Sequence, residues 1–311
     1  MAARAHPATD RETRLATRVG RSMGSPLRLT ARATRVDAAW AAIVDTFERA
    51  EHDLTRFDPD SPLSRLNVRA GKGLRAVPVM LAAALGMGQR AYRASEGIFD
   101  PRIIGALEDA GEHAGVVLPS SPAELRAAEC WLRLDARRGL AALDAPVDLG
   151  GIGKGLALRW AAHAVRRLGV DDFIIEAGGD IVAAGAPPAG GTWEVAIEQP
   201  GSRDPAAVVA LGGCAIATSS IAVRSWVGPD GKPAHHLIDP RTGRPASSGL
   251  TSVTVAASDP AWAEVRSKVG FILGAEAVAR RPAWWIRPDG ALGMTAAARD
   301  LTRWQRRSPS G

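Results

Sequence analysis

The sequence predicts an α+β protein that forms a single large domain. Four segments carry apolar residues at helical spacing, and short apolar strands occur in runs rather than in strict strand–helix–strand repeats. No Ser/Gly-rich linker divides the 311 residues and no internal repeat is evident. These observations favour one large core over two separate domains.

The elements are predicted in order along the chain. The first helix, over 36–56, places its apolar residues on one face, and the second, over 79–95, is rich in alanine. A third helix follows a glycine-rich loop, and a fourth covers roughly 258–280. Short strands are expected at Phe173–Ala177, Trp193–Ile197, Ala206–Leu211, Cys214–Ala217 and Leu250–Ala256, with a terminal hairpin from Trp284–Ile286 and Gly290–Met294.

Both ends of the chain are expected to lie outside the folded domain. Residues 1–22 are polar and rich in arginine, which predicts a disordered basic N-terminus, and residues 301–311 are predicted to be a mobile tail. The folded domain is therefore expected over 23–300.

Composition excludes several classes of protein. No window of 18 apolar residues occurs and the N-terminal segment lacks an apolar signal core, so no membrane span or secretion signal is expected. Cys130 and Cys214 are the only cysteines, which fits a reducing compartment, and the cytoplasm is the predicted location. The net charge of +6 comes from arginines that are spread along the chain, so no nucleic-acid partner is expected.

The glycine loop Asp148-Leu149-Gly150-Gly151-Ile152-Gly153-Lys154-Gly155 is the main chemical signal. Backbone amides and one ammonium between a strand and a helix suit a phosphate. The loop is neither a P-loop, which needs Ser or Thr where Gly155 stands, nor a dinucleotide fingerprint, which needs glycine where Leu156 stands. A tight turn without a ligand is the structural alternative.

Further motifs follow in a fixed order. They are Met23-Gly24-Ser25, Phe57-Asp58-Pro59-Asp60-Ser61, Gly97-Ile98-Phe99-Asp100-Pro101, Ala177-Gly178-Gly179-Asp180, Ala217-Thr218-Ser219-Ser220 and His235-His236-Leu237-Ile238-Asp239-Pro240-Arg241-Thr242-Gly243-Arg244-Pro245. Together with the glycine loop, this series resembles the FAD:protein FMN transferases, the ApbE-type flavin transferases, from about residue 20 to about residue 300. The resemblance implies mixed sheets with packed helices.

The resemblance also implies a reaction. The family binds FAD with a divalent metal, usually Mg²⁺, at the pyrophosphate, and an acceptor threonine or serine attacks the FMN-side phosphorus and expels AMP. An acceptor flavoprotein is therefore the expected partner. The residues that match its cofactor-binding motifs are Met23, Phe57, Ile98, Phe99, Asp100, Asp148, Lys154, Asp180, Thr218 and Ile238.

Several of these residues have a plain structural interpretation as well. Lys154 is expected to face phosphate oxygens, but a surface lysine is the alternative. Asp148 could anchor the loop or cap the following helix. Phe57 and Met23 could contact the flavin or fill the core, and Pro101 makes a simple turn at Asp100 equally reasonable.

His236 is the candidate general base or phosphate partner, because imidazole titrates near neutral pH. Its neighbours Asp239 and Thr242 are expected to fix its tautomer. Arg224 follows at the family's spacing for a basic residue.

The fourth helix departs from the family pattern. An aspartate and, four residues later, a threonine are replaced by Glu264 and Lys268. Glu264 with the carbonyl of Gly151 could still bind magnesium, or the ammonium of Lys268 could take the place of the metal and act in catalysis. A simple ion pair between Glu264 and Lys268 is the third possibility, worth about 0.3–0.5 kcal/mol.

Three functions therefore remain open. The first is an active FAD:protein FMN transferase. The second is a flavin-binding homologue with weak or no transfer, which hydrolyses FAD or carries flavin. The third is a non-catalytic regulatory or assembly protein that has kept the fold.

Overall fold

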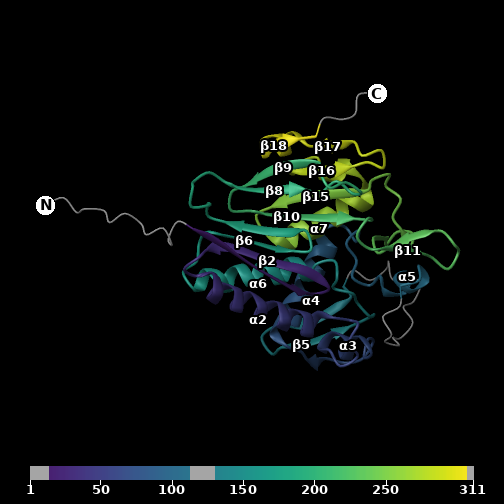
Figure 1. Ribbon diagram of the computed structural model, residues 1–311. Coiled ribbons are helices and arrows are strands. Elements are labelled where there is room, and N and C mark those ends of the chain that lie inside the picture. Colours follow the sequence, from purple (N-terminus) through teal and green to yellow (C-terminus); the bar gives the residue numbers. More distant parts are fainter. Residues whose placement is uncertain (1–13, 113–129, 307–311) are drawn as a thin grey trace.

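An eight-stranded antiparallel sheet forms the centre of the molecule (Figure 1). The computed structural model describes residues 14–112 and 130–306. The strand order is β1-β2-β6-β7-β10-β15-β16-β17. Their bounds are β1 Leu15–Ser22, β2 Ser25–Arg32, β6 Phe173–Ala177, β7 Asp180–Ala184, β10 Ala215–Ser220, β15 Ser252–Ala257, β16 Ala283–Ile286 and β17 Leu292–Met294.

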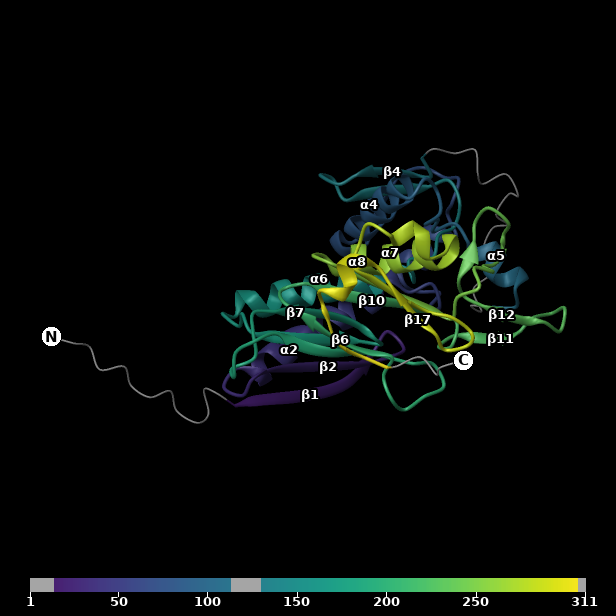
Figure 2. The same ribbon diagram turned by 90° about the horizontal axis from the view of Figure 1, so that it is seen from above.

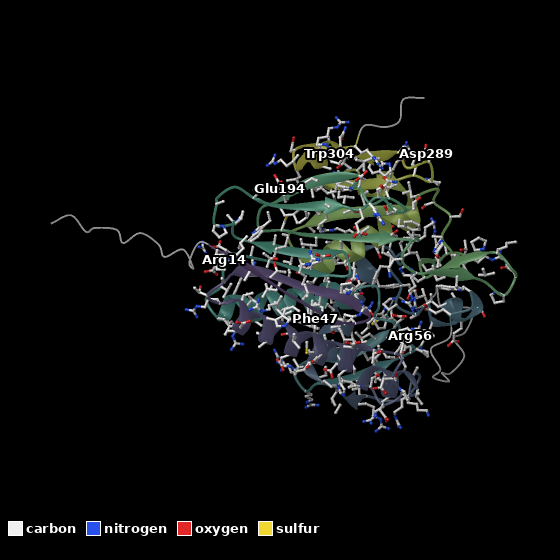
Figure 3. All side chains as sticks on the ribbon, viewed as in Figure 1. Arg14, Phe47, Arg56, Glu194, Asp289 and Trp304 are labelled. Carbon is white, nitrogen blue, oxygen red and sulfur yellow. The ribbon has the colours of Figure 1, made fainter. Side chains whose placement is uncertain are left out.

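Helices cover one face of this sheet. Phe173 and Ile175 of β6 point into the same apolar core as Phe47, which is fully buried (Figure 3). Residue 174, between them, points to the opposite face. The helices of this core are α2 Val36–Leu54, α3 Pro62–Asn67, α4 Val79–Ala94, α6 Gly153–Arg167 and α7 Pro260–Leu273. The short helix α8 Ala296–Arg299 packs on the opposite face, and α5 Ile104–Asp109 belongs to a small separate cluster. A 3₁₀ turn, η2, lies at Ala275–Val278.

A small second sheet covers the opposite face. Its order is β18-β9-β8, and its residues share a core with Ile181 and Ile216 of the large sheet. The large sheet is therefore buried on both sides near β7 and β10, between helices and a second sheet. The strands are β8 Trp193–Ile197, β9 Ala207–Leu211 and β18 Thr302–Gln305.

The remaining strands form small sheets at the periphery. They are β3 Arg75–Ala76, β4 Leu132–Asp135 and β5 Leu140–Leu143 in one sheet, and the hairpins β11 Ser225–Val227 with β12 Pro233–His235 and β13 Ile238–Asp239 with β14 Arg244–Pro245. Both views place β11 beside α5 (Figure 1, Figure 2), and Trp226 Nε1 donates to the carbonyl of Ala110 over 2.6 Å. This contact joins β11 to the end of α5. Because β11 pairs with β12, which ends just before His236, it also helps to position His236.

Most of the expected elements are confirmed. The strands at Phe173–Ala177 and Trp193–Ile197 have the predicted bounds, and the first two predicted helices start at residues 36 and 79 as expected. The third helix, α6, opens from the glycine loop as expected and starts at Gly153. The fourth helix ends earlier than predicted, at Leu273, because Gly274 adopts φ 94° and the chain continues as a 3₁₀ turn.

The expected ends of the domain are wrong in two places. Residues 15–22, predicted to be disordered, form β1 and pair along their whole length with β2. Residues 302–305, predicted to be part of a mobile tail, form β18 and pair with β9. Both are edge strands, whose polar side chains face solvent and hide the strand pattern. Residues 1–13 and 307–311 lie outside the described residues. Within the described chain, no helix is long and apolar enough to cross a membrane.

Candidate active site

The glycine loop, residues 148–155, connects the buried Val147 to the first turn of α6. Asn67 fixes its start, because Asn67 Nδ2 donates to the carbonyl of Val147 over 2.9 Å and Oδ1 accepts from its N–H over 2.9 Å. At its end the loop passes close to α7, where a Cβ on Gly155 would come within 2.6 Å of Cα of Ala261. Gly155 is therefore required by helix packing, and the loop amides lie at the N-terminus of α6.

Lys154 lies between two buried carboxylates. Its Nζ bonds to Asp180 Oδ2 and lies 3.9 Å from Glu264 Oε1. Burial disfavours the ammonium, but the two carboxylates outweigh it and raise the pKa of Lys154 to about 12. Lys154 is thus protonated at neutral pH, and its charge is already balanced within the protein.

The same carboxylates bind backbone groups from distant elements. Glu264 Oε2 accepts the N–H of Gly155 over 2.8 Å, and Asp180 Oδ1 accepts the N–H of Thr218 over 3.1 Å. Burial raises the pKa of Glu264 to about 7, against the opposing effect of Lys154. Four predicted site residues therefore form one connected cluster that joins α6, β7, β10 and α7.

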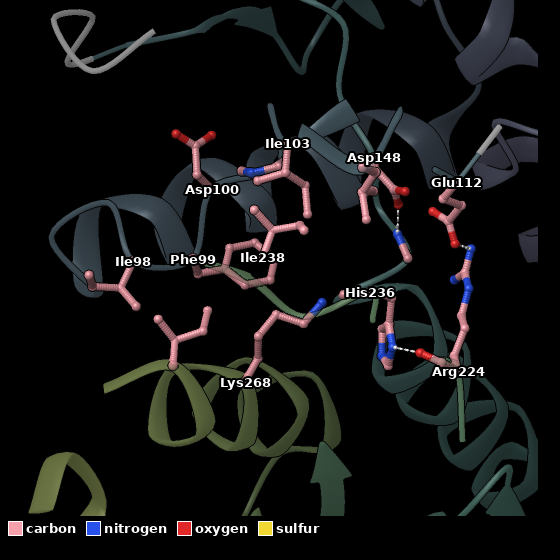
Figure 4. Close-up of a pocket in the computed structure, with 15 residues that line it drawn as sticks. Ile98, Phe99, Asp100, Ile103, Glu112, Asp148, Arg224, His236, Ile238 and Lys268 are labelled. Atoms are coloured by element: carbon pink, nitrogen blue, oxygen red, sulfur yellow. Dashed lines mark hydrogen bonds and ion pairs between the residues drawn. The ribbon is translucent and has the colours of Figure 1, made fainter. Parts of the chain in front are cut away.

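A pocket lies beside this cluster, between the glycine loop, α7 and the segment around His236 (Figure 4). Many of the predicted site residues line it, which brings together motifs from distant parts of the chain. These residues are Ile98, Phe99, Asp100, Asp148, Gly151, His236, Ile238 and Lys268. Glu112 and Arg224 also line the pocket.

Lys268 points from α7 into this pocket (Figure 4). Its Nζ lies against Gly151, where a Cβ would collide with it, and 6.0 Å from the ring centroid of Phe99. The ion pair with Glu264, the third of the possibilities for this helix, does not form, because Glu264 turns toward Gly155 and Lys154. Within residues 14–112 and 130–306, Lys268 has no ion-pair partner, and burial lowers its pKa.

His236 faces the same pocket. Its Nδ1 lies 3.1 Å from the carbonyl of Arg224, which fixes the ring, whereas Asp239 bonds to Arg241. The prediction that Asp239 and Thr242 set its tautomer is therefore wrong. Burial, followed by the charge of Lys268, lowers the pKa of His236 to about 3. Because a carbonyl only accepts, Nδ1 carries the proton of this neutral imidazole and Nε2 has a free lone pair.

A buried charge network forms the wall opposite Lys268. Arg56 Nη2 donates to Glu112 over 2.6 Å and Arg56 also pairs with Asp148, while Arg224 pairs with Glu112. Burial would raise the pKa of Asp148, but Arg56 and the N–H of Gly150 lower it. Arg56 and Glu112 were missed from the sequence, because one arginine among 35 gives no pattern.

Two predicted cofactor residues lie outside the pocket lining, and a third, Asp100, lines it but is engaged with an arginine. Phe57 lies outside the pocket lining and is 50% exposed, with the guanidinium of Arg56 4.5 Å from its ring centroid. Met23 packs against Gly153 at the start of α6. The carboxylate of Asp100 binds Arg102 over 2.7 Å, so it supports the pocket wall as an anchor of that guanidinium.

The donors at the expected metal site do not fit a magnesium ion. Mg²⁺ requires near-octahedral oxygen ligands. Both oxygens of Glu264 face N–H or ammonium groups, Asp180 is paired with Lys154, and the ammonium of Lys268 lies against Gly151. In the described part of the chain, no three His, Cys, Asp or Glu side chains are grouped so that they could hold a metal.

Comparison with known proteins places this arrangement in a family. The model of the ApbE family matches residues 23–283. An FAD:protein FMN transferase of Salmonella typhimurium is 30% identical over 261 residues, which cover 76% of this chain and 73% of that protein. A Klebsiella pneumoniae protein of the same name is 36% identical over 132 residues, 42% of this chain and 37% of that protein.

The fold agrees with this assignment. The crystal structure of an ApbE protein from Thermotoga maritima superposes with a TM-score of 0.81, at 22% identity, over 94% of this chain and all of that one. The family model covers most of the chain, and it includes the glycine loop, the His236 segment and α7. The chain therefore belongs to the ApbE family.

Proposed function

We propose that this protein is an FAD:protein FMN transferase, which moves FMN from FAD to a threonine or serine hydroxyl of an acceptor protein and releases AMP. The main support is that His236 lines the same pocket as the glycine loop and is held through Nδ1 by the carbonyl of Arg224, which leaves Nε2 as the nitrogen that can accept a proton. A base and the N-terminus of α6 thus adjoin one pocket.

His236 accepts the proton of the attacking hydroxyl at Nε2, while its Nδ1–H stays on the carbonyl of Arg224. The oxygen of the acceptor forms the new bond to the FMN-side phosphorus, and the bond to the AMP phosphate breaks. The negative pyrophosphate raises the basicity of the imidazole when it enters, since it offsets the nearby cations.

The pyrophosphate binds beside Gly151 at the start of α6, where the helix N-terminus favours negative charge. The N–H groups of Gly150 and Gly155 hold the loop in place through Asp148 and Glu264. Arg56 holds Asp148 at the base of this loop and so keeps the amides in place. Phe57 offers an exposed ring next to Arg56 and Arg224 on which a flat base or flavin can stack. A magnesium ion enters no step, because the donors do not fit one.

The test uses the purified protein, FAD and a peptide that carries an acceptor threonine. We expect AMP and a fluorescent flavin-labelled peptide in equal amounts. The variant His236→Asn keeps an N–H for the carbonyl of Arg224 and removes the base, so transfer should fall by about 100-fold or more while FAD still binds. Full transfer by this variant would contradict the role of His236.

The other two functions give different products in this assay. AMP without a labelled peptide would identify an FAD hydrolase, and retained FAD without AMP would identify a flavin-binding protein. A protein that neither binds nor converts FAD would be a non-catalytic member of the family.

A further inference from the structure

Lys268 is a partly buried cation that has no ion-pair partner in the part of the chain that the structure describes. Its two nearest sources of negative charge are already engaged: Asp148 with Arg56, and Glu264 with Lys154 and the N–H of Gly155. Buried charges in proteins are usually paired, so an unpaired ammonium that points into a pocket indicates an anionic ligand.

The other cations of the site differ from Lys268 in this respect. Lys154 bonds to Asp180, Arg56 to Asp148, and Arg224 to Glu112. Among the cations of the site in residues 14–112 and 130–306, Lys268 is therefore the one whose charge can pair with a ligand at the glycine loop.

The position of Lys268 decides which part of the ligand it meets. Its Nζ lies against the backbone at Gly151, next to the amides at the start of α6. We propose that the Lys268 ammonium is a built-in replacement for a divalent cation at the pyrophosphate of FAD, so that this protein binds and cleaves FAD without metal. This inference rests on the proposed transferase function and specifies how its substrate is bound.

The transfer reaction can proceed with the Lys268 ammonium at the pyrophosphate in place of a metal ion. The acceptor oxygen bonds to the FMN-side phosphorus, its proton moves to His236, and the bond to the AMP phosphate breaks with its electron pair on AMP. Lys268 donates hydrogen bonds to the pyrophosphate oxygens as charge shifts to the leaving phosphate, and it keeps its proton throughout. A divalent ion at Gly151 would be repelled by this ammonium.

The test measures FAD affinity and does not depend on transfer. The parent protein is titrated with FAD in EDTA and again in excess Mg²⁺, and flavin fluorescence is followed. We expect the two dissociation constants to agree within about twofold. Magnesium that tightens binding by tenfold or more would overturn the proposal.

A pair of lysine variants completes the test. Lys268→Met removes the charge and keeps the length of the chain, and FAD binding in EDTA should weaken by about tenfold or more. Lys72→Met removes an exposed lysine and serves as the control, with unchanged binding. Thermal unfolding of each variant shows whether it is folded. Parent-like affinity of folded Lys268→Met would overturn the proposal.

The transferase function and the role of Lys268 can be refuted separately. Lysine-dependent, metal-independent FAD binding without AMP or labelled peptide would refute the transferase and leave the role of Lys268 standing. AMP release that stops in EDTA would refute the role of Lys268 and leave the transferase standing. Absence of FAD binding under both conditions would refute both.

Discussion

Gly155 should be intolerant of even one added methyl group. A Cβ at this position would lie 2.6 Å from Cα of Ala261 and 2.6 Å from the carbonyl oxygen of Pro260. Both are backbone atoms of α7, so no side chain can move aside. Relief to an ordinary contact of about 3.4 Å requires α6 and α7 to separate by about 0.8 Å.

The expected cost of Gly155→Ala follows from two opposing effects. Overpacking in a core costs about 1–3 kcal/mol, and alanine returns about 1 kcal/mol through its helix propensity. Because rigid backbone limits relaxation, the upper end of the cost applies, and the free energy of unfolding should fall by about 2 kcal/mol. The N–H of Gly155 would also shift relative to Glu264, so FAD conversion should fall as well.

Gly88 provides a matched control in the interior of α4. A Cβ there would lie 3.6 Å from Pro101 Cγ and 3.6 Å from the Trp131 ring, which is ordinary contact. Gly88→Ala should therefore stabilise the protein by about 0.5–1 kcal/mol. Urea denaturation followed by tryptophan fluorescence measures both variants. If Gly155→Ala were as stable as Gly88→Ala, the close approach of the two helices would be refuted.

Three further predictions concern the site. Lys268→Thr combined with Glu264→Asp should make FAD binding depend on magnesium, because the ammonium is replaced by oxygen ligands. FAD titrations with and without EDTA measure this dependence, and equal dissociation constants would contradict the proposed role of Lys268. Burial, and then the charge of Lys268, holds the pKa of His236 at about 3, so ¹⁵N NMR should show a neutral ring from about pH 5 to 8 and a raised pKa in Lys268→Met. Since this folded-state pKa lies below the usual 6.5, the unfolded chain takes up a proton at His236 before the folded protein does. The contribution of neutral His236 to the free energy of unfolding is therefore complete above about pH 6.5 and is lost toward pH 3, by at most about 1.4 kcal/mol per pH unit. Urea titrations of His236→Asn should lack this slope. Arg56→Met should leave Asp148 and Glu112 without this buried partner and cost about 3–5 kcal/mol in the same assay, whereas a loss below about 1 kcal/mol would disprove the network.

The sequence predicts the interior of the fold better than its edges. The strands at Phe173–Ala177 and Trp193–Ile197 are apolar because they lie in packed layers, so their pattern gives their bounds. β1 and β18 are edge strands with many polar residues, and only their pairing partners show that they are ordered.

The candidate site shows the same division. Motifs brought His236, Lys268 and Gly151 to one pocket because each motif occupies a fixed place in the fold. The partners of these side chains were not predictable, since they depend on contacts between distant segments. The sequence left open whether Glu264 binds a metal or pairs with Lys268 one helical turn away, and the structure shows it bonded to the N–H of Gly155 in another helix.

Metal-free transfer can be tested in a single incubation of the protein with FAD and an acceptor peptide in EDTA, in which AMP is measured by chromatography and the labelled peptide by mass spectrometry. We expect one AMP for each FMN attached to the peptide, at a rate that magnesium does not change. FAD recovered intact, or AMP formed only when magnesium is added, would contradict this expectation.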